Sequence, residues 1–334
     1  MTPQKHSNWL SQVSEDILDP GRRIVDPHHH LWRDRRGAPY LLADLHADTS
    51  SGHDIQKTVF VECRASYRDD GPEHLRPIGE TEFVAEIAVA SAAVPGAATI
   101  AGIVAHADLT RGEDVEEVLE AHAEAGQGLF RGIRHSGARD PHPEALSIPG
   151  RAPEGLYSSD DFRDGMRVLG RLGLTFDTWN YHHQLAEFAD LARAVPETTM
   201  ILDHFGTPLG VGPYRDRREE IFEQWRTDIA SVAECPNVVA KLGGLAMPDN
   251  GFGWNDRATP ATSDELVEAQ KRYYLHTIDC FGPERCMMES NFPVDKRSIS
   301  YPVMWNGLKK MTAEFSEDEK DAMFFGTATR IYRL

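Results

Sequence analysis

The chain contains 334 residues, and its 53 acidic and 35 basic side chains give a formal charge of −18 with histidine neutral. Hydrophobic residues make up 40% and charged residues 26%, which is typical of a folded globular protein and not of a disordered or fibrous one. The acidic balance argues against nucleic acid and against an anionic membrane surface as partners, because both need a basic face.

The length suits about two domains, although α/β barrels of this size form one. Residues 1–22 lack the apolar run of a signal peptide, and we interpret them as a short polar N-terminal extension to a single domain over residues 23–334. An uncharged stretch over residues 87–107 has the length of a membrane span. Because Pro95-Gly96 interrupts it, we expect a helix end followed by a buried strand.

The chain has four cysteines, none of which belongs to a CxxC pair: Cys63, Cys235, Cys280 and Cys286. Four thiols in a chain of this length do not make a disulfide framework. We therefore expect them to be reduced and the protein to be cytoplasmic.

Short apolar runs alternate with longer helical patterns along the chain. The predicted strands cover residues 23–26, 57–63, 99–105, 129–134, 174–179, 200–204, 238–242 and 285–289. The predicted helices lie between them, over residues 80–93, 113–124, 160–171, 184–195, 218–233, 263–281 and 301–314. Continuous apolar runs are typical of parallel strands buried on both faces, and this alternation predicts an α/β fold, a (β/α)8 TIM barrel.

A doubly wound open sheet is the alternative fold. Such a sheet usually carries a glycine-rich phosphate loop after its first strand, whereas this chain has Pro27-His28-His29-His30 there. Two long loops rich in proline, glycine and charge, over residues 137–159 and 246–262, are either walls of a substrate site or surface decoration.

Polar side chains occur where most of the predicted strands end. Barrel active sites lie at the C-terminal ends of the strands, so these side chains are the candidate site residues. In chain order they are His28, His30, Glu62, Arg131, Arg134, His182, His204, Lys241 and Asn291.

His28 and His30 form the strongest motif, because residues i and i+2 of an extended segment point the same way. Two neutral imidazoles on one side can bind a divalent metal ion. With His204 at a later strand end, they predict a site for one metal ion. The alternative is that these histidines make ordinary hydrogen bonds in a loop.

Six segments together resemble the amidohydrolase superfamily, and more narrowly the branch that contains sugar-lactone and pyrone-dicarboxylate lactonases and related metal-dependent decarboxylases. In order they are Ile24-Val25-Asp26-Pro27-His28-His29-His30-Leu31-Trp32, Phe130-Arg131-Gly132-Ile133-Arg134, Ile201-Leu202-Asp203-His204-Phe205-Gly206-Thr207-Pro208, Lys241-Leu242-Gly243-Gly244, Glu289-Ser290-Asn291-Phe292-Pro293-Val294 and Phe325-Gly326-Thr327-Ala328. The resemblance implies a distorted barrel.

The resemblance also implies roles for individual residues. His28, His30 and His204 match metal-facing positions, and Arg131 and Arg134 match positions that bind substrate carboxylate in some relatives. Asn291 departs from the family, which usually has an aspartate there that ligates metal and deprotonates water.

An asparagine cannot take a proton from water, although its oxygen can still ligate a hard metal ion. Three readings follow. Another group serves as the base, with Glu289, Asp295, Glu62 or a histidine as candidates. Alternatively, the metal activates water without a dedicated base, or the chain has lost hydrolysis.

Three further residues have open roles. Glu62 is a ligand or base, or else a structural partner of Arg64 or Arg134. Lys241 contacts substrate or forms a salt bridge inside the barrel. Either His182 or its neighbour faces the site.

We expect a hydrolase that opens a lactone of a small anionic or sugar-like metabolite. The expected cofactor is one divalent metal ion, Zn or Mn, or none if the reaction is metal-independent. A non-oxidative decarboxylase of an aromatic or enoic acid and a non-catalytic barrel are the alternatives. We also expect a homodimer.

Overall fold

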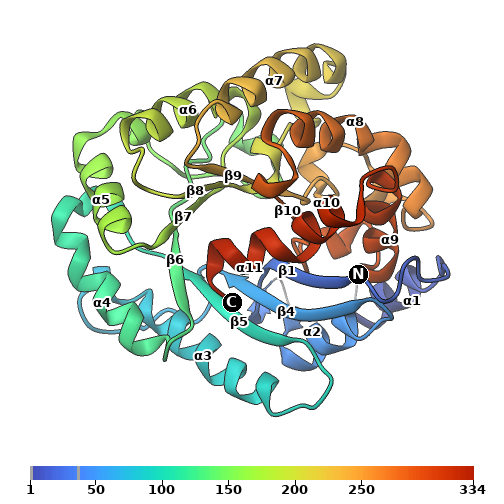
Figure 1. Cartoon of the computed structure of the whole chain (residues 1–334), viewed down its shortest axis with the longest axis horizontal. Helices are drawn as coiled ribbons and strands as arrows, with labels where there is room; N and C mark the ends of the chain where they lie inside the picture. Colours follow the sequence, from blue (N-terminus) through green and yellow to red (C-terminus); the bar gives the residue numbers. More distant parts are fainter. Residues whose placement is uncertain (1–2, 36–37) are drawn as a thin grey trace.

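The computed structural model describes residues 3–35 and 38–334, and its centre is one sheet of eight parallel strands that follow each other in sequence order (Figure 1). The strands are β1 (Arg23–His29), β4 (Asp54–Val61), β5 (Thr99–Ala105), β6 (Phe130–Arg134), β7 (Thr175–Thr178), β8 (Met200–Leu202), β9 (Val238–Leu242) and β10 (Cys286–Met288). The sheet curves until its ends meet just beyond β10, where the His30 amide donates to the carbonyl of Phe292 at 2.8 Å. The predicted (β/α)8 barrel is confirmed.

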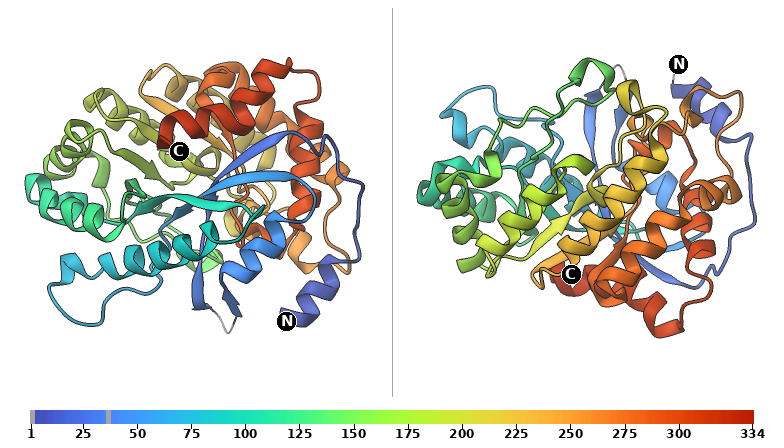
Figure 2. Two further views of the ribbon diagram at one scale, coloured as in Figure 1. Left: turned by 60° about the horizontal axis from the view of Figure 1, so that its bottom comes forward. Right: turned by 90° about the horizontal axis from the view of Figure 1, so that it is seen from above.

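Helices surround the strands on the outside (Figures 1 and 2). They are α3 (Ile78–Ala92), α4 (Glu116–Ala125), α5 (Asp160–Arg171), α6 (Leu185–Ala194), α7 (Arg218–Ala233), α8 (Ser263–Phe281) and α9 (Tyr301–Met311). α8 begins at Ser263 because the hydroxyl of Thr262 accepts from the amide of Glu265, whose carboxylate in turn accepts from the Thr262 amide. Glycine at position 282, with φ of +75°, ends this helix.

Several short elements were not predicted from the sequence. They are α1 (Pro3–Leu10), the antiparallel pair β2 (Trp32–Arg35) and β3 (Ala38–Tyr40), α2 (Leu42–Thr49), α10 (Glu317–Asp321) and α11 (Thr327–Tyr332). The sixth predicted strand also ends two residues early. The chain turns at Asp203–Gly206, where His204 has φ of +53°, so His204 stands in a tight turn and not in a strand.

The uncharged stretch over residues 87–107 holds the end of α3 and the whole of β5, as expected. Among residues 3–35 and 38–334 we find no helix with the length and apolar character needed to cross a membrane.

The N-terminal segment is packed on the barrel domain. The Trp9 indole donates to the carbonyl of Arg257 at 3.1 Å, and the Glu15 carboxylate accepts from the Ser263 amide at 2.8 Å.

Two apolar layers hold the barrel. The larger lies between strands and helices, and the smaller fills the barrel interior with one side chain from most strands. Its members are Val25, Val59, Val61, Val104, Ile201, Val239, Met287, Ala328 and Tyr332. The last two come from α11, which crosses one end of the barrel (Figure 1). Arg333 and Arg330 of this segment bind carbonyls just before β7 and β10, so α11 covers the end at which the strands begin.

Candidate active site

Three side chains from three distant parts of the chain meet at the C-terminal ends of the strands. One oxygen of Glu289 lies 2.6 Å from Nδ1 of His204, and the other lies 2.8 Å from Nδ1 of His28. The two imidazole rings are 4.5 Å apart between centroids. One ligand atom from each residue falls within 4.8 Å of the others, which is a spacing that a single metal ion could bridge. We call these three residues the His28–His204–Glu289 cluster.

Two glycines after β9 make room for this cluster. A Cβ on Gly244 would lie 2.2 Å from Nδ1 of His204, and one on Gly243 would lie 2.3 Å from the carbonyl oxygen of Glu289. Gly244 also has φ of +74°, a conformation that favours glycine. Because Gly243 and Gly244 have no side chains, the Lys241-Leu242-Gly243-Gly244 segment leaves room for His204 and Glu289.

The electrostatics of the cluster depend on Glu289. Burial alone would raise the pKa of Glu289, but His204 and His28 lower it to about 2. Burial lowers the pKa of His28 well below its usual value. At His204 burial also lowers the pKa, but the charge and hydrogen bond of Glu289 together with the charges of Asp203 and Asp295 outweigh it, and the pKa is raised. The Glu289 carboxylate therefore favours the protonated form of His204. A metal ion would displace that proton.

Buried oxygen atoms without a hydrogen-bond partner surround the cluster. Both carboxylate oxygens of Asp203 and Oε2 of Glu289 are of this kind, although Oδ1 of Asp203 lies 3.3 Å from the Lys241 ammonium and Oε2 of Glu289 lies 2.8 Å from Nδ1 of His28. Buried acceptors are normally paired, so this group fits a cation. Histidine nitrogens with a carboxylate are donors that suit zinc, and the residues present therefore fit the expected divalent metal.

His30 lies beside the cluster without belonging to it. Its ring centroid is 5.0 Å from that of His28, at nearly a right angle. Its Nδ1 is 2.7 Å from the carbonyl of Val61, to which it donates, so Nε2 is left for another partner. The structure thus brings all three predicted histidines together.

Lys241 lies beneath the cluster and is fully buried. Its ammonium is 2.7 Å from Asp177 and 3.3 Å from Asp203. Burial opposes its charge, but these two carboxylates hold its pKa above the usual value. The hydroxyl of Tyr332, from α11, donates to the same oxygen of Asp177 at 2.5 Å. Of the two roles open for Lys241, the structure has the salt bridge.

The two predicted arginines of β6 have different surroundings. Arg134 donates to Oε1 of Glu62 at 3.0 Å and to the Glu62 carbonyl, and it lies 3.6 Å from Asp203. Arg131 binds carbonyls at the other end of the strands, those of Gly128 and Ala101. The structure therefore brings Arg134 and Glu62 to the site as an ion pair, and it does not bring Arg131 there.

The side chain of Asn291 is bound to Asp295, and within the described residues no hydrogen bond joins it to His28, His204 or Glu289. Its side-chain amide donates to Asp295 at 2.9 Å, and the other oxygen of Asp295 accepts from the Ala246 amide at 3.0 Å. Burial raises the pKa of Asp295 to about 7. Asp295 thus pairs with Asn291 and Ala246, and the carboxylate that contacts the two histidines is Glu289, two residues before Asn291.

His182, the remaining predicted histidine, does not belong to the cluster. Its Nδ1 accepts from the Leu209 amide at 3.3 Å, and its ring contacts His183 and Tyr214. Within the described ranges, no hydrogen bond or ring contact connects His182 with the cluster. The two long loops meet nearby, where Asp249 accepts from the amides of Ser147 and Ile148 at 2.6 and 2.9 Å.

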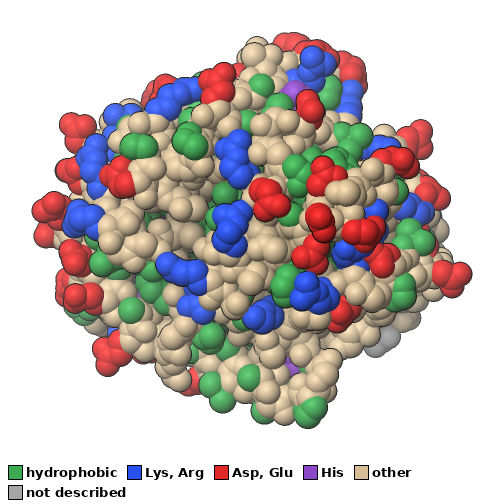
Figure 3. All heavy atoms as spheres, viewed as in Figure 1, with side chains coloured by type: hydrophobic (Ala, Val, Ile, Leu, Met, Phe, Trp, Pro, Cys, Tyr) green, Lys and Arg blue, Asp and Glu red, His purple; other side chains and the backbone are tan. Residues whose placement is uncertain are grey.

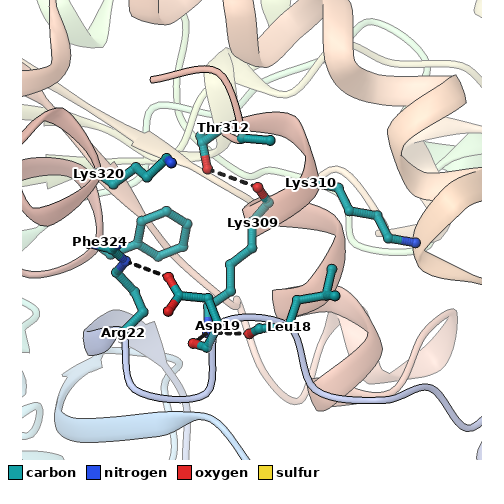
Figure 4. A pocket seen from close by; sticks show the side chains of 9 residues that line it. Leu18, Asp19, Arg22, Lys309, Lys310, Thr312, Lys320 and Phe324 are labelled. Carbon is teal, nitrogen blue, oxygen red and sulfur yellow. Dashed lines mark hydrogen bonds and ion pairs between the residues drawn. The ribbon is translucent and has the colours of Figure 1, made fainter. Parts of the chain in front are cut away.

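A cavity of about 270 Å³ lies elsewhere, between the N-terminal segment, α9 and α10 (Figure 4). Its most buried cation, Lys309, already donates to the carbonyls of Leu18 and Asp19 and to His53. Acidic and basic side chains are interspersed over the molecular face in Figure 3, which shows no broad basic surface. We therefore place the candidate active site at the His28–His204–Glu289 cluster, and not at this cavity or on this surface.

Comparison with known proteins agrees with this geometry. The family model described as amidohydrolase matches residues 25–334, so the chain belongs to the amidohydrolase family. It is 32% identical to the uncharacterized protein y4mH of Sinorhizobium fredii, over 93% of this chain and 98% of that protein. It is 25% identical to L-fucono-1,5-lactonase of Burkholderia multivorans, over 94% of this chain and 97% of the lactonase. A crystal structure of a B. multivorans amidohydrolase with bound zinc superimposes with a TM-score of 0.72 at 23% identity, covering 93% of this chain and 99% of that one.

Three acidic residues at the site, Glu289, Asp177 and Asp203, were not among the predicted site residues. Glu289 entered only as a candidate base, and Asp177 only as a residue within a strand. The signal available for Glu289 was its place at the end of the last strand, directly before Ser290-Asn291. The signal available for Asp177 was its position within a continuous apolar run. A carboxylate buried in such a strand needs a charged partner.

Proposed function

We propose that this protein is a metal-dependent hydrolase that opens a lactone, the cyclic ester of a small anionic or sugar-like metabolite. The observation that carries the proposal is the convergence of Glu289 on both His28 and His204. The similarity to an L-fucono-1,5-lactonase supports the lactone, and the zinc in a structural relative supports the metal.

His28, His204 and Glu289 would hold one divalent ion, Zn or Mn, with His30 at its side. A bound ion supplies Lewis acidity toward a carbonyl oxygen or a water molecule. Glu289 replaces the missing aspartate as the carboxylate of the site and takes the proton from water. Asp203 and Lys241 hold the ring of His28 from below, with the lysine ammonium 3.4 Å from Nδ1.

The test is an assay of purified protein with Zn²⁺ or Mn²⁺ added, against a panel of lactones, with acid release followed by pH-stat. The same reactions are run with aromatic and enoic carboxylates while released carbon dioxide is measured. Acid release from lactones without carbon dioxide supports the proposal. Carbon dioxide release alone would identify a decarboxylase. No turnover together with no bound metal would identify a non-catalytic barrel.

A further inference from the structure

The buried charges around the His28–His204–Glu289 cluster form a network of ion pairs that does not balance. Within the described residues, this network contains four carboxylates and two permanent cations: Glu62, Asp177, Asp203, Glu289, Arg134 and Lys241. Asp295, which is hydrogen-bonded to neutral groups, lies outside it. With the histidines neutral, the network has an excess of two negative charges, which one divalent ion would neutralise.

The ammonium of Lys241 stands where side chains of this network converge. Nζ lies 2.7 Å from Oδ2 of Asp177, 3.3 Å from Oδ1 of Asp203 and 3.4 Å from Nδ1 of His28. These four side chains are fully buried. Carboxylate oxygens and imidazole nitrogens are also donors that bind divalent metal ions. Lys241 therefore places an internal cation where its neighbours could hold a metal ion.

The two carboxylates depend on this cation. Neither oxygen of Asp203 has a hydrogen-bond partner, and the cations paired with it are Lys241, 3.3 Å from Oδ1, and Arg134, 3.6 Å from Oδ2. The hydroxyl of Tyr332 fixes Asp177 by donating to Oδ2 at 2.5 Å, but it carries no charge. Removal of the ammonium would leave two buried carboxylates beside the vacated position, and a buried carboxylate needs a cation.

We propose that Lys241 limits this site to one metal ion, because its ammonium fills a second cation position between Asp177 and Asp203. The inference deepens the proposed function and rests on it for the first ion, which the His28–His204–Glu289 cluster would hold. Its test compares metal binding between proteins and needs no substrate.

The charge of the network explains this limit. With Lys241 present, one divalent ion brings the network to neutrality, and a second would leave two positive charges in excess. Without the ammonium, two divalent ions would leave only one positive charge in the same buried space. Since uncompensated buried charge is costly, Lys241 excludes the second ion and its removal admits it.

A purely structural ion pair is the competing explanation. Lys241 would then stabilise the fold through its two carboxylates, and its loss would destabilise the protein equally with and without metal ions. Lys309 is a second buried lysine that allows a matched comparison. Its ammonium donates to the carbonyls of Leu18 and Asp19 and contacts Nδ1 of His53, so its acceptors are neutral groups.

The experiment measures Mn²⁺ bound per chain by equilibrium dialysis of protein first freed of metal with a chelator. Mn²⁺ is used because carboxylate oxygens suit it. Lys241→Ala removes the ammonium and leaves space, whereas Lys241→Met removes the charge but fills most of that space. We expect Lys241→Ala to bind about one ion more per chain than the wild type, and Lys241→Met and Lys309→Ala to bind no more. Equal binding by Lys241→Ala and the wild type overturns the inference.

Urea unfolding with and without Mn²⁺ gives a second readout. An ion at about 100 times its dissociation constant raises the folding equilibrium constant about 100-fold. At that Mn²⁺ concentration, Lys241→Ala should therefore gain about 100-fold more than the wild type gains, and Lys309→Ala no more than the wild type. A gain in Lys241→Ala that only equals that of the wild type contradicts the inference.

The remaining outcomes separate this inference from the proposed function. If the wild type binds no Mn²⁺, the metal-dependent function fails, whereas one ion bound by Lys241→Ala still supports the role of Lys241, and none overturns it. Folding of Lys241→Ala that requires Mn²⁺ also supports it. If Lys241→Ala folds under neither condition, Lys241→Ser takes its place with the same expected results.

Discussion

Oε1 of Glu289 lies 2.6 Å from Nδ1 of His204, although 85 residues separate the two in the chain. The contact joins the end of β10 to the turn after β8, and it brings a carboxylate to the histidines two positions before Asn291, where the family resemblance implies an aspartate. We therefore propose Glu289 as the acid of the site in place of that aspartate.

Glu289→Gln tests this replacement. The amide keeps the size of the side chain but removes the charge that pairs with both histidines. We expect metal content to fall well below one ion per chain and activity to fall on the order of 100-fold or more. Elemental analysis and the lactone assay measure the two effects. Glu314→Gln, an exposed control, should change neither, and full metal occupancy in Glu289→Gln would contradict the role.

Gly244→Ala tests the packing around His204. The added Cβ would lie 2.2 Å from Nδ1 of His204, at a backbone φ of +74°, so the imidazole must move. We expect a stability loss of about 1 kcal/mol or more, and a loss of activity of about 10-fold or more from the displaced ligand. Denaturant unfolding and the lactone assay report both. In Gly21→Ala nothing lies within 4 Å of the new Cβ, and that variant should resemble the wild type.

Lys241→Met tests the ion pair inside the barrel. The substitution leaves Asp177 and Asp203 buried without their cation, and the expected loss is about 3–5 kcal/mol in the free energy of unfolding. Urea unfolding measures it. The double variant Lys241→Met with Asp177→Leu should recover part of the loss, because it removes one of the uncompensated charges. A single variant as stable as the wild type would show that the pair contributes nothing.

Asn291→Asp restores the residue usual in the family, and we expect it to destabilise this protein. The new carboxylate would face Asp295, which now accepts from the Asn291 amide at 2.9 Å and has a pKa of about 7. A folded-state pKa above the unfolded value gives stability that is present at low pH and lost as pH rises. A second carboxylate raises that pKa further.

The difference in unfolding free energy between Asn291→Asp and the wild type should therefore be small near pH 5 and grow toward pH 8. Unfolding curves at several pH values in that interval measure it. A difference that does not depend on pH would show that Asp295 is not the group involved.

The sequence predicted those features of the fold that depend on residues close together in the chain. Continuous apolar runs predicted the eight strands, and β5 and β9 have the predicted bounds. The helix predicted over residues 263–281 has the bounds of α8, and its capping residue is Thr262. The i and i+2 spacing placed His28 beside His30. Strand ends were less predictable: β8 ends at Leu202, and the space for the His204 imidazole in the left-handed turn that follows depends on the absence of a side chain at the distant Gly244.

By itself, the sequence determined the barrel and the rim on which polar side chains collect, and it has an asparagine at position 291, where the resemblance implies an aspartate. Tertiary structure alone decided which carboxylate meets the histidines, and it turned Asn291 toward Asp295 and Arg134 toward Glu62. The different surroundings of Arg131 and Arg134, by contrast, already follow from their places near the start and at the end of β6 and from their odd spacing, which turns them to opposite faces of the strand. The physical reason is that hydrophobic periodicity is a local property of the chain, whereas the pairing of buried charges depends on which side chains the closed sheet brings within a few ångströms of one another.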